Sequence, residues 1–410
     1  MEHLNALKGM DKLRKQLEAK RTRVLMRYRY YDMKNGVKYF RTLIPTEFMW
    51  MAHTLGWCGK AVDSLGDRLN FREFKNDDFN LAEILAVNNG DRLPDNAIKG
   101  ALIGSCSFVY ISENEKGEPK LQVVDGSDAT GVMDPSTGML TEGYAVLSRD
   151  ENDKPEMEAY FLPYRTEYFY KGEKNRVRGH FAPYPLLVPV NYRPDAKRPF
   201  GHSRISRACM SLQQGAMRTL LRSEVAAEFY SFPQKYATGV AQDTEVDGFK
   251  ALMSSFLWFE KDEEGDAPKL GQFTQQSMSP YTEQLRTFAS LFAGETGLTL
   301  DDLGFVSDNP SSAEAIKASH ETLRLTAEKA QKAFGADLLN MGYLAACVRD
   351  GIAYERSRFY RTKAAWYPAF KPDAAALSGI GDGITKINLA IPGYIGPGNM
   401  QDLTGIDPES

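Results

Sequence analysis

The chain has 410 residues, of which 42% are hydrophobic and 25% charged, and its net charge is −4 at pH 7. This composition is typical of a globular protein and excludes a disordered chain, and the length exceeds the roughly 250–300 residues at which one hydrophobic core stops growing. The acidic balance also argues against a repressor-like DNA-binding protein, because gripping duplex DNA requires a dense basic surface.

Targeting and redox signals are few. The N-terminal residues 1–29 are rich in Lys, Arg and Glu without an apolar segment, so no signal peptide is predicted. No run of about 18 apolar residues occurs, so no membrane span is expected. The four cysteines contain no C-x-x-C pair and indicate buried thiols in a reducing compartment: Cys58, Cys106, Cys209 and Cys347.

The first half of the chain is predicted to mix helices with antiparallel strands. A charged helix is expected at 4–27, followed by a turn at 32–36 and by short helical and extended pieces at 45–75. Further helices are expected at 79–88 and 94–105. From Ser107 to Leu187 the hydrophobic pattern has period two, which predicts strands at 107–112, 120–124, 143–148, 157–162 and 166–170.

A helix of about 30 residues is predicted at 203–232, where Pro233 ends it. It has two apolar sides, one with Ile205, Cys209, Leu212, Ala216, Leu220 and Ala227, the other with Met210, Met217 and Leu221. A third sector carries the arginines Arg204, Arg207, Arg218 and Arg222. Two apolar sides favour a neighbour on each side, either from other subunits or within a large monomer.

A short mixed module is predicted at 233–273, and a second helix at about 277–295 ends at Gly297. The module contains an acidic run: Glu260, Asp262, Glu263, Glu264 and Asp266. Such a run is either a solvated hairpin tip or a docking surface for a partner.

Residues 299–312 are predicted to be a loop, because Asp, Gly, Ser, Asn and Pro dominate them. A capping box, Ser311-x-x-Glu314, then begins a long helix. Its apolar side repeats every 3.6 residues from 316 to 348 and includes His320, which we expect to be partly buried and hydrogen-bonded. A last helix is expected at 373–391, followed by a Gly/Pro-rich turn at 392–398.

No motif for catalysis, metal or cofactor binding stands out. The five histidines are dispersed, no phosphate-binding G-x-x-x-x-G-K-[ST] or G-x-S-x-G occurs, and the glycines of 379–383 do not complete a dinucleotide-binding motif. Asp301 and Asp302 lack a second acidic cluster at a readable spacing. We therefore predict that the chain is not an enzyme and needs no cofactor or metal. A metal-dependent nucleic-acid enzyme is an alternative that a DNA cleavage assay would test.

Several short strings resemble portal proteins of tailed bacteriophages with long non-contractile tails. They are Tyr30-Tyr-Asp-x-x-x-Gly36, Val62-Asp-Ser-Leu-Gly-Asp-Arg-Leu69, Pro189-Val-Asn-Tyr-Arg193 leading to Gly201-His-Ser-Arg-Ile205, and 275–297 closing on Thr296-Gly297. Leu303-Gly304 with Asp308-Asn-Pro-Ser-Ser-Ala-Glu-Ala-Ile316, Trp366 and the Asp382/Lys386 helix complete the set. Each string is weakly specific, and their order and spacing over residues 28 to 390 carry the resemblance.

The resemblance implies an α+β portal fold with an α/β wing, a helical stem, a small mixed α/β clip, a tunnel loop, a long wing helix and a short or truncated helical crown. The implied regions are the N-terminal helix and wing at 1–202, the first stem helix at 203–232, the clip at 233–273, the second stem helix at 274–297, the tunnel loop at 298–312, the long helix and return to the wing at 313–370, and a crown-proximal helix and tail at 371–410.

The resemblance also implies a function without chemistry. A ring of subunits, expected to be a dodecamer, would stand at one capsid vertex and conduct double-stranded DNA during packaging and ejection. It would nucleate procapsid assembly with the major capsid and scaffolding proteins, and dock the terminase large subunit and the head–tail adaptor. The implied location is the virion, and the host cytoplasm during assembly, with no membrane contact.

The resemblance assigns roles to two sets of residues. The DNA-facing tunnel loop would contain Asp301, Asp302, Phe305, Val306, Ser307, Asp308 and Asn309, and the clip would dock partners through its acidic run. A different head–tail connector component is the main alternative, although such adaptors are generally shorter. A solitary scaffold protein would differ by its molecular mass in solution.

Overall fold

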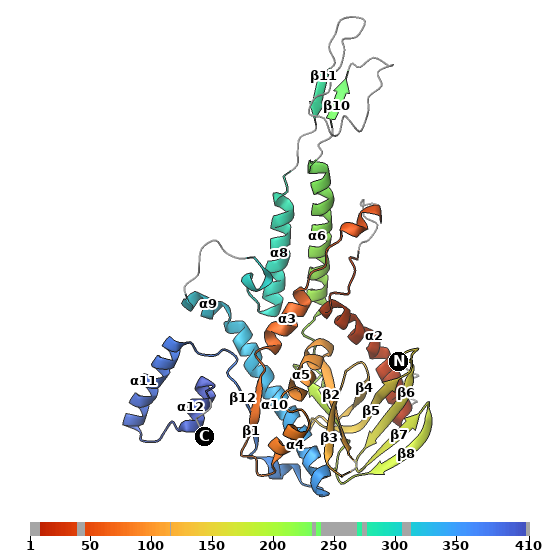
Figure 1. Ribbon diagram of the computed structural model, residues 1–410, viewed down its shortest axis with the longest axis vertical. Helices are drawn as coiled ribbons and strands as arrows, with labels where there is room; N and C mark the ends of the chain where they lie inside the picture. The colour runs from red at the N-terminus through yellow and green to blue at the C-terminus, as the bar shows by residue number, and fades with distance from the viewer. Residues whose placement is uncertain are drawn as a thin grey trace, which may run out of the picture. The chain divides into compact units, whose positions relative to one another are not determined.

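The computed structural model of the protein describes residues 9–38, 46–114, 116–231, 235–238, 269–272, 277–305 and 313–406 (Figure 1). Its helices and small antiparallel sheets make an α+β fold, as predicted. The chain divides into two compact units. The first contains Met1–Lys34, Gly56–Met210 and Gly294–Ser410, and the second contains Asn35–Leu55 and Ser211–Ala293.

The first unit holds most of the regular structure. Its helices include α2 (Gly9–Tyr31), α3 (Trp57–Gly66), α4 (Leu81–Val87), α5 (Leu93–Gly104), α9 (Ala313–Ser319), α10 (Glu321–Asp350), α11 (Ala374–Ala390) and α12 (Pro397–Thr404), with 3-10 turns η2 (Asp301–Leu303) and η3 (Arg356–Phe359). Its strands include β1 (Phe71–Lys75), β2 (Cys106–Glu113), β3 (Pro119–Val124), β4 (Ala129–Met133), β5 (Leu140–Arg149), β6 (Pro155–Leu162), β7 (Arg165–Tyr170), β8 (Glu173–Gly179), β9 (Leu187–Asn191) and β12 (Lys363–Trp366).

The strands of the first unit form three antiparallel sheets. Five follow in chain order, β4-β5-β6-β7-β8, and the others pair as β3-β2-β9 and β1-β12. The tight turns of the large sheet come from aspartates that accept hydrogen bonds from backbone N–H groups two residues ahead. Asp134 does so between β4 and β5, and Asp150 between β5 and β6. These turn residues explain why the predicted β-rich stretch became a meander.

Helix α2 packs on this sheet. Leu13 and Leu17 are buried against Tyr144 and Val146 of β5. The guanidinium of Arg14 donates two hydrogen bonds, of 3.0 and 3.1 Å, to the buried carboxylate of Glu158 on β6. A charged helix therefore becomes part of the wing-like α+β body, because one side of it carries leucines and a paired arginine.

Helix α10 supplies the centre of the first unit, where it contacts β9, β12 and α4. The predicted apolar side is confirmed, because its members from 323 onward are all buried: Leu323, Ala327, Ala330, Phe334, Leu338, Met341, Ala345 and Val348. The predicted single helix is wrong in one respect. It breaks into α9 and α10 at His320, whose φ and ψ of −92° and 1° are not α-helical. The capping box at 311–314 begins outside the described residues.

The second unit contains most of α6 (Arg207–Ser231) and α8 (Ser279–Thr296), the 3-10 turn η1 (Thr46–Met51), and the strands β10 (Lys235–Thr238) and β11 (Lys269–Gln272), which pair antiparallel. Helix α6 begins at Arg207 and not at the predicted residue 203. Ser206 sets this start, because its Oγ accepts a hydrogen bond of 3.1 Å from the Cys209 N–H.

The ends of the chain and the cysteines complete the comparison with the sequence. All four cysteines are buried and free, as predicted. The predicted helix at 373–391 is confirmed as α11, and Asp373 caps it by accepting from the Ala376 N–H. The short helix α12, in contrast, was not predicted, and only its first two residues fall in the predicted turn at 392–398. Within the described segments, no helix has the length and apolar character needed to cross a bilayer.

Candidate functional site

The two predicted stem helices pack against each other, and Figure 1 shows α6 and α8 side by side. They lie close together at Gly215, where an added methyl group would lie 2.8 Å from the Phe288 ring. One turn further on, the Thr219 hydroxyl lies 2.9 Å from Oε1 of Gln284. A glycine thus lets an aromatic ring of α8 lie directly on the backbone of α6.

The other side of α6 is covered by residues 35–38 of the same chain. Gln214 donates to the Gly36 carbonyl at 3.0 Å and accepts from the Lys38 N–H at 2.7 Å. Asn35 lies 3.4 Å from the Met217 sulfur. Of the two alternatives left open by the sequence, these contacts support the second, because the same chain supplies a neighbour on both sides of this helix.

The four predicted stem arginines do not share a sector. Arg204 precedes α6, is only 7% exposed, and donates hydrogen bonds to the carbonyls of Ala61 and Thr296. Arg207 is the exposed first residue of α6, Arg218 donates to the Lys38 carbonyl at 3.2 Å, and Arg222 is exposed. The predicted sector is wrong for Arg204 because the helix starts after it, so that residue follows a turn and not the helical repeat.

Arg204 belongs to a junction of backbone ends. Its N–H donates to the Leu102 carbonyl at 2.8 Å, and the Ser203 hydroxyl donates to the Ile103 carbonyl at 2.7 Å. These carbonyls lie at the C-terminal end of α5, and Thr296 is the last residue of α8. Carbonyls at helix ends lack partners within the helix. The segment before α6 therefore donates hydrogen bonds to the unpaired carbonyls at the C-terminal ends of α5 and α8.

The start of the predicted tunnel loop is a rigid turn. Asp302 accepts hydrogen bonds of 2.9 Å from both the N–H and the hydroxyl of Thr299, and Leu303 is buried. Gly297 and Gly304 have positive φ, of 68° and 90°, which ends α8 and η2 respectively. A 3-10 turn thus replaces part of the predicted loop. Asp301 is exposed and Phe305 partly buried.

The remaining predicted tunnel-loop residues, Val306, Ser307, Asp308 and Asn309, lie outside the described residues. So do all five acidic clip residues: Glu260, Asp262, Glu263, Glu264 and Asp266. Of the predicted clip, the structure describes the β10–β11 pair, whose register joins Lys235 to Gln272 and Thr238 to Lys269.

His320 lies at the break between α9 and α10, next to this turn. Its Nδ1 is 4.0 Å from the Asp302 carboxylate, and its ring is 5.9 Å from that of Phe370. The prediction of a partly buried side chain is confirmed, whereas the expected hydrogen bond is not present for Nδ1 within the described residues. His320 is thus a packing residue at a helix break.

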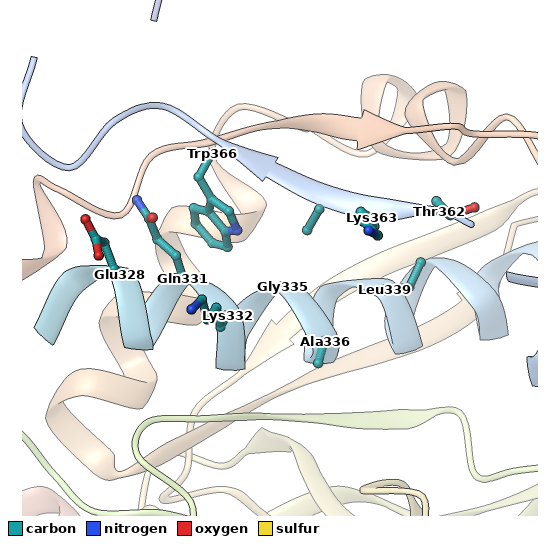
Figure 2. Close-up of a pocket in the computed structure, with 10 residues that line it drawn as sticks. Glu328, Gln331, Lys332, Gly335, Ala336, Leu339, Thr362, Lys363 and Trp366 are labelled. Carbon is teal, nitrogen blue, oxygen red and sulfur yellow. The ribbon is translucent and has the colours of Figure 1, made fainter. Parts of the chain in front are cut away.

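A groove of about 480 Å³ runs between α10 and β12 (Figure 2). The side chains of Gln331 and Lys332 line it from the helix, and Lys363 and Trp366 from the strand. Its floor is narrow because Gly335 faces the strand, where a methyl group would lie 3.0 Å from the Ala364 side chain. No predicted site residue lines this groove, and its lining lacks a nucleophile paired with a base.

Acidic and metal-binding side chains are also dispersed. The described segments hold no cluster of three or more His, Cys, Asp or Glu side chains with metal-binding geometry. Asp337 on α10 is partly buried, which raises the pKa of its carboxyl to about 8, and it accepts a 2.8 Å hydrogen bond from the Asn191 N–H. It joins α10 to β9, which is a structural role.

The chain is similar to known proteins over most of its length. It is 25% identical over 330 residues to the portal protein of Mycobacterium phage L5, covering 75% of this chain and 67% of the relative. Identity to the portal protein of Mycobacterium phage D29 is 24%, with the same coverage.

Two solved structures are similar in shape. The neck of a native gene transfer agent particle, computed with C12 symmetry, matches with a TM-score of 0.47 at 15% identity, covering 89% of this chain and 94% of that chain. The neck of an empty particle, computed with C6 symmetry, matches with a TM-score of 0.44 at 14% identity, covering 92% and 97%. The family model "Phage portal protein, SPP1 Gp6-like" matches residues 10–357. The resemblance predicted from the sequence is therefore confirmed, and this chain belongs to the SPP1 Gp6-like family of phage portal proteins.

Proposed function

We propose that the chain forms a closed ring of twelve copies at one capsid vertex, through which double-stranded DNA is packaged and ejected. The ring nucleates procapsid assembly with the major capsid and scaffolding proteins, and it docks the terminase large subunit and then the head–tail adaptor. Family membership supports this function, and the mycobacteriophage relatives are themselves named portal proteins. The ring belongs to the virion and passes through the host cytoplasm during assembly.

The function requires assembly and not catalysis. The family is one of structural proteins, which agrees with the prediction that the chain is not an enzyme. The wing, stem, clip and crown regions inferred from the sequence are part of the proposal, with the first stem helix now starting at Arg207.

The observation that carries the ring is the apolar seam of α11. Leu377, Ile380, Ile384 and Ile387 follow one another at spacings of three and four residues, which is the pattern of a helix that packs on another helix, and Ile391 follows the helix end in an extended conformation. No residue of α11 is buried, and Ile387 and Ile391 are 41% and 55% exposed. Within the described residues, Leu377, Ile380 and Ile384 are only partly covered, so a partner from another copy would complete the burial of this apolar seam.

The positions beside this seam favour a neighbour on each side. In two-stranded coiled coils they usually carry charges, whereas here they hold small or amide side chains, among them Gly381 and Gly383. Each glycine costs a helix roughly 1 kcal/mol relative to alanine. Nothing in the chain lies within 4 Å of a methyl group at either position, so packing within the chain does not require glycine there. Close approach of neighbouring helices on both sides of α11, as in a ring, would explain why glycine occurs at these two positions.

Replacing Ile384 by glutamate tests the ring. Ile384→Glu places a charge in the seam and is expected to shift the protein from rings to smaller species, whereas Thr385→Glu, on the exposed neighbouring position, should leave rings intact. Native mass spectrometry across a range of concentrations measures both variants. Wild-type protein that stays monomeric at all concentrations would contradict the proposal, and so would equal assembly of the two variants.

The tunnel loop is proposed to touch DNA in transit without gripping it. Its described part is anchored by Leu303 and by the Thr299–Asp302 turn, and Asp301 is exposed and acidic, so it repels phosphate. Removing residues 305–307 is expected to preserve rings and procapsids but to impair packaging or retention of DNA. Normal packaging by the deletion variant would show that the loop is only a connection.

The acidic clip run is proposed to dock protein partners. Reversing the charges of Glu263 and Glu264 should leave rings intact and slow the association with terminase or adaptor, because peripheral charges act mainly on association rate. Surface plasmon resonance with both partners measures this effect. Unchanged association rates would contradict the docking role and indicate that the acidic run is only a solvated hairpin tip.

A further inference from the structure

Five cations gather where α2 meets the segment before α6. They come from one side of α2 and from residues 198–207, and we call them the α2 cation patch: Lys20, Arg23, Arg27, Arg198 and Arg207. Lys20 joins the two parts, because its Nζ lies 5.3 Å from the Phe108 ring centre and 5.9 Å from that of Phe200. Arg27 donates to the Gly104 carbonyl at 2.9 Å, which fixes its guanidinium beside the end of α5.

The segment that carries Arg198 is held in one conformation. Gly201 has a φ of 71°, and a methyl group there would lie 2.1 Å from the Tyr192 carbonyl oxygen, so the chain turns tightly at this residue. The His202 ring lies between Asp195, 2.6 Å from its Nε2, and Arg198, 3.3 Å from its Nδ1. If Nε2–H donates to Asp195, then Nδ1 accepts from Arg198, and the guanidinium is oriented before any ligand arrives.

The patch has an excess of positive charge, although the carboxylates of Asp125 and Asp128 act on Lys20. In the part of the chain that the structure describes, none of its five side chains forms an ion pair. The nearby carboxylates have other partners, since Asp125 accepts from the Tyr28 hydroxyl at 2.5 Å and Asp128 from Arg149 at 2.6 Å. Burial lowers the pKa of Lys20, and burial together with the neighbouring arginines lowers that of Arg27. Lys20 and Arg27 therefore stand in surroundings that disfavour their charge.

Helix stability does not explain this arrangement either. Arg207 is the first residue of the 25-residue helix α6, where the helix dipole is positive and a cation is unfavourable. Arg23, Arg198 and Arg207 are all exposed, so an anion can reach them from solvent. Like charges held together by a rigid turn and a helix are typical of an anion-binding surface.

We propose that the α2 cation patch binds the phosphodiester backbone of duplex DNA. Lys20, Arg23 and Arg27 span seven residues, or about 10 Å of helix at 1.5 Å per residue, and a DNA strand carries a phosphate about every 3.4 Å along its axis. Arginine forks suit phosphate oxygens particularly well. An acidic peptide is a poorer fit, because a helix side and a turn offer charge but no open strand edge to bind its backbone.

The proposal goes beyond ring formation, because the patch shares no residue with the tunnel loop, the clip or the α11 seam. DNA binding on it would depend on salt, because each phosphate contact releases bound counterions. A local basic cluster that holds DNA weakly also fits the acidic net charge of −4.

The test compares two double variants of the full chain. Arg23→Gln/Arg207→Gln removes two exposed patch cations, and the control Lys154→Gln/Arg176→Gln removes two exposed cations from the large sheet with the same change in net charge. Fluorescence anisotropy with a short labelled duplex gives Kd at several salt concentrations. The patch variant should weaken binding on the order of 100-fold at about 50 mM salt and reduce the slope of log K against log salt by about 2. The control should keep both values.

Three further measurements decide the outcome. Arg23→Lys/Arg207→Lys should restore most of the affinity, since it keeps the charges. Equal binding by the patch and control variants overturns the proposal, and so does patch-dependent binding of polyglutamate without binding of duplex. Native mass spectrometry of the same samples separates this result from the ring. Loss of rings only in the patch variant would assign the cations to a contact between subunits and would also overturn the DNA-binding proposal. If the wild-type protein forms no rings, that result contradicts the function proposed above and leaves the DNA-binding proposal untouched.

Discussion

Arg204 should be the most sensitive arginine of the chain. It is 7% exposed and donates to the carbonyls of Ala61 and Thr296, at a point where α3, α5 and α8 converge. A hydrogen bond from a charged donor contributes about 1.5–3 kcal/mol, and a buried acceptor left alone costs a similar amount. Arg204→Ala removes two such bonds, so it should lower the free energy of unfolding by about 3–5 kcal/mol.

Urea denaturation followed by circular dichroism measures this loss. With an m-value of about 3 kcal/mol per molar, the midpoint should fall by about 1–2 M. Because the chain has two units, hydrogen exchange locates the effect, and amides of α3 and of the end of α8 should exchange faster than those of the β4–β8 sheet. Arg204→Lys keeps the positive charge but lacks the several donors of the guanidinium, so its free energy of unfolding should fall by about half as much as that of Arg204→Ala.

Arg207 is the matched control, three residues away and exposed. Arg207→Ala should change the unfolding free energy by no more than about 0.5 kcal/mol. Equal effects of Arg204→Ala and Arg207→Ala would refute the junction and restore the view that both arginines belong to one solvated sector.

Two further predictions concern the stem pair and the pH dependence of stability. Gly215→Ala should lower the free energy of unfolding, measured in urea, by about 1–3 kcal/mol, because the new methyl group would lie 2.8 Å from the Phe288 ring. Gly294→Ala on α8 has no described atom within 4 Å of its methyl group and should raise the free energy of unfolding by about 0.5–1 kcal/mol. A change of the same sign in both variants would contradict the packing. Burial lowers the pKa of His180 from 6.5 to about 4, so the unfolded chain takes up a proton at a higher pH than the folded chain. The free energy of unfolding should therefore fall by about 3 kcal/mol as the pH drops from about 6.5 to 4. Urea titrations at several pH values should show this fall in the wild type and not in His180→Phe, and the same pH dependence in both would contradict the prediction.

Periodicity predicted the elements that have one buried side. The apolar side of α10 was readable because each buried residue recurs at helical spacing, and β5 and β6 were readable from alternation. Strand β8 was not predicted, because its residues are exposed and charged and it exists only through pairing with β7. Helix α12 was likewise missed, since it is held by the Asp402 carboxylate, 2.9 Å from Arg72 and 2.6 Å from Lys75, across more than 300 positions in the sequence.

The candidate site was predictable only in part, because its determinants are distant in the sequence. The order helix, strand pair, helix follows from local patterns and is present as α6, β10–β11 and α8. The cover of α6 by residues 35–38 depends on side chains about 180 positions apart, Asn35 with Gln213 and Met217 among them. Assigning Arg204 to the helix failed for a local reason, since the cap at Ser206 competes with continuation of the helical repeat.

The strings that identified the family also have a physical explanation. Pro189–Arg193 and Gly201–Ile205 meet at one place, where the Tyr192 N–H donates to the Ser105 carbonyl and the His202 N–H donates to the Tyr192 carbonyl. At Gly201 the backbone excludes any side chain, and at Arg204 two helix ends need a long cationic donor. These residues are constrained by the junction and not by contact with DNA. The same turn holds Arg198, so it also orients an exposed cation of the α2 patch.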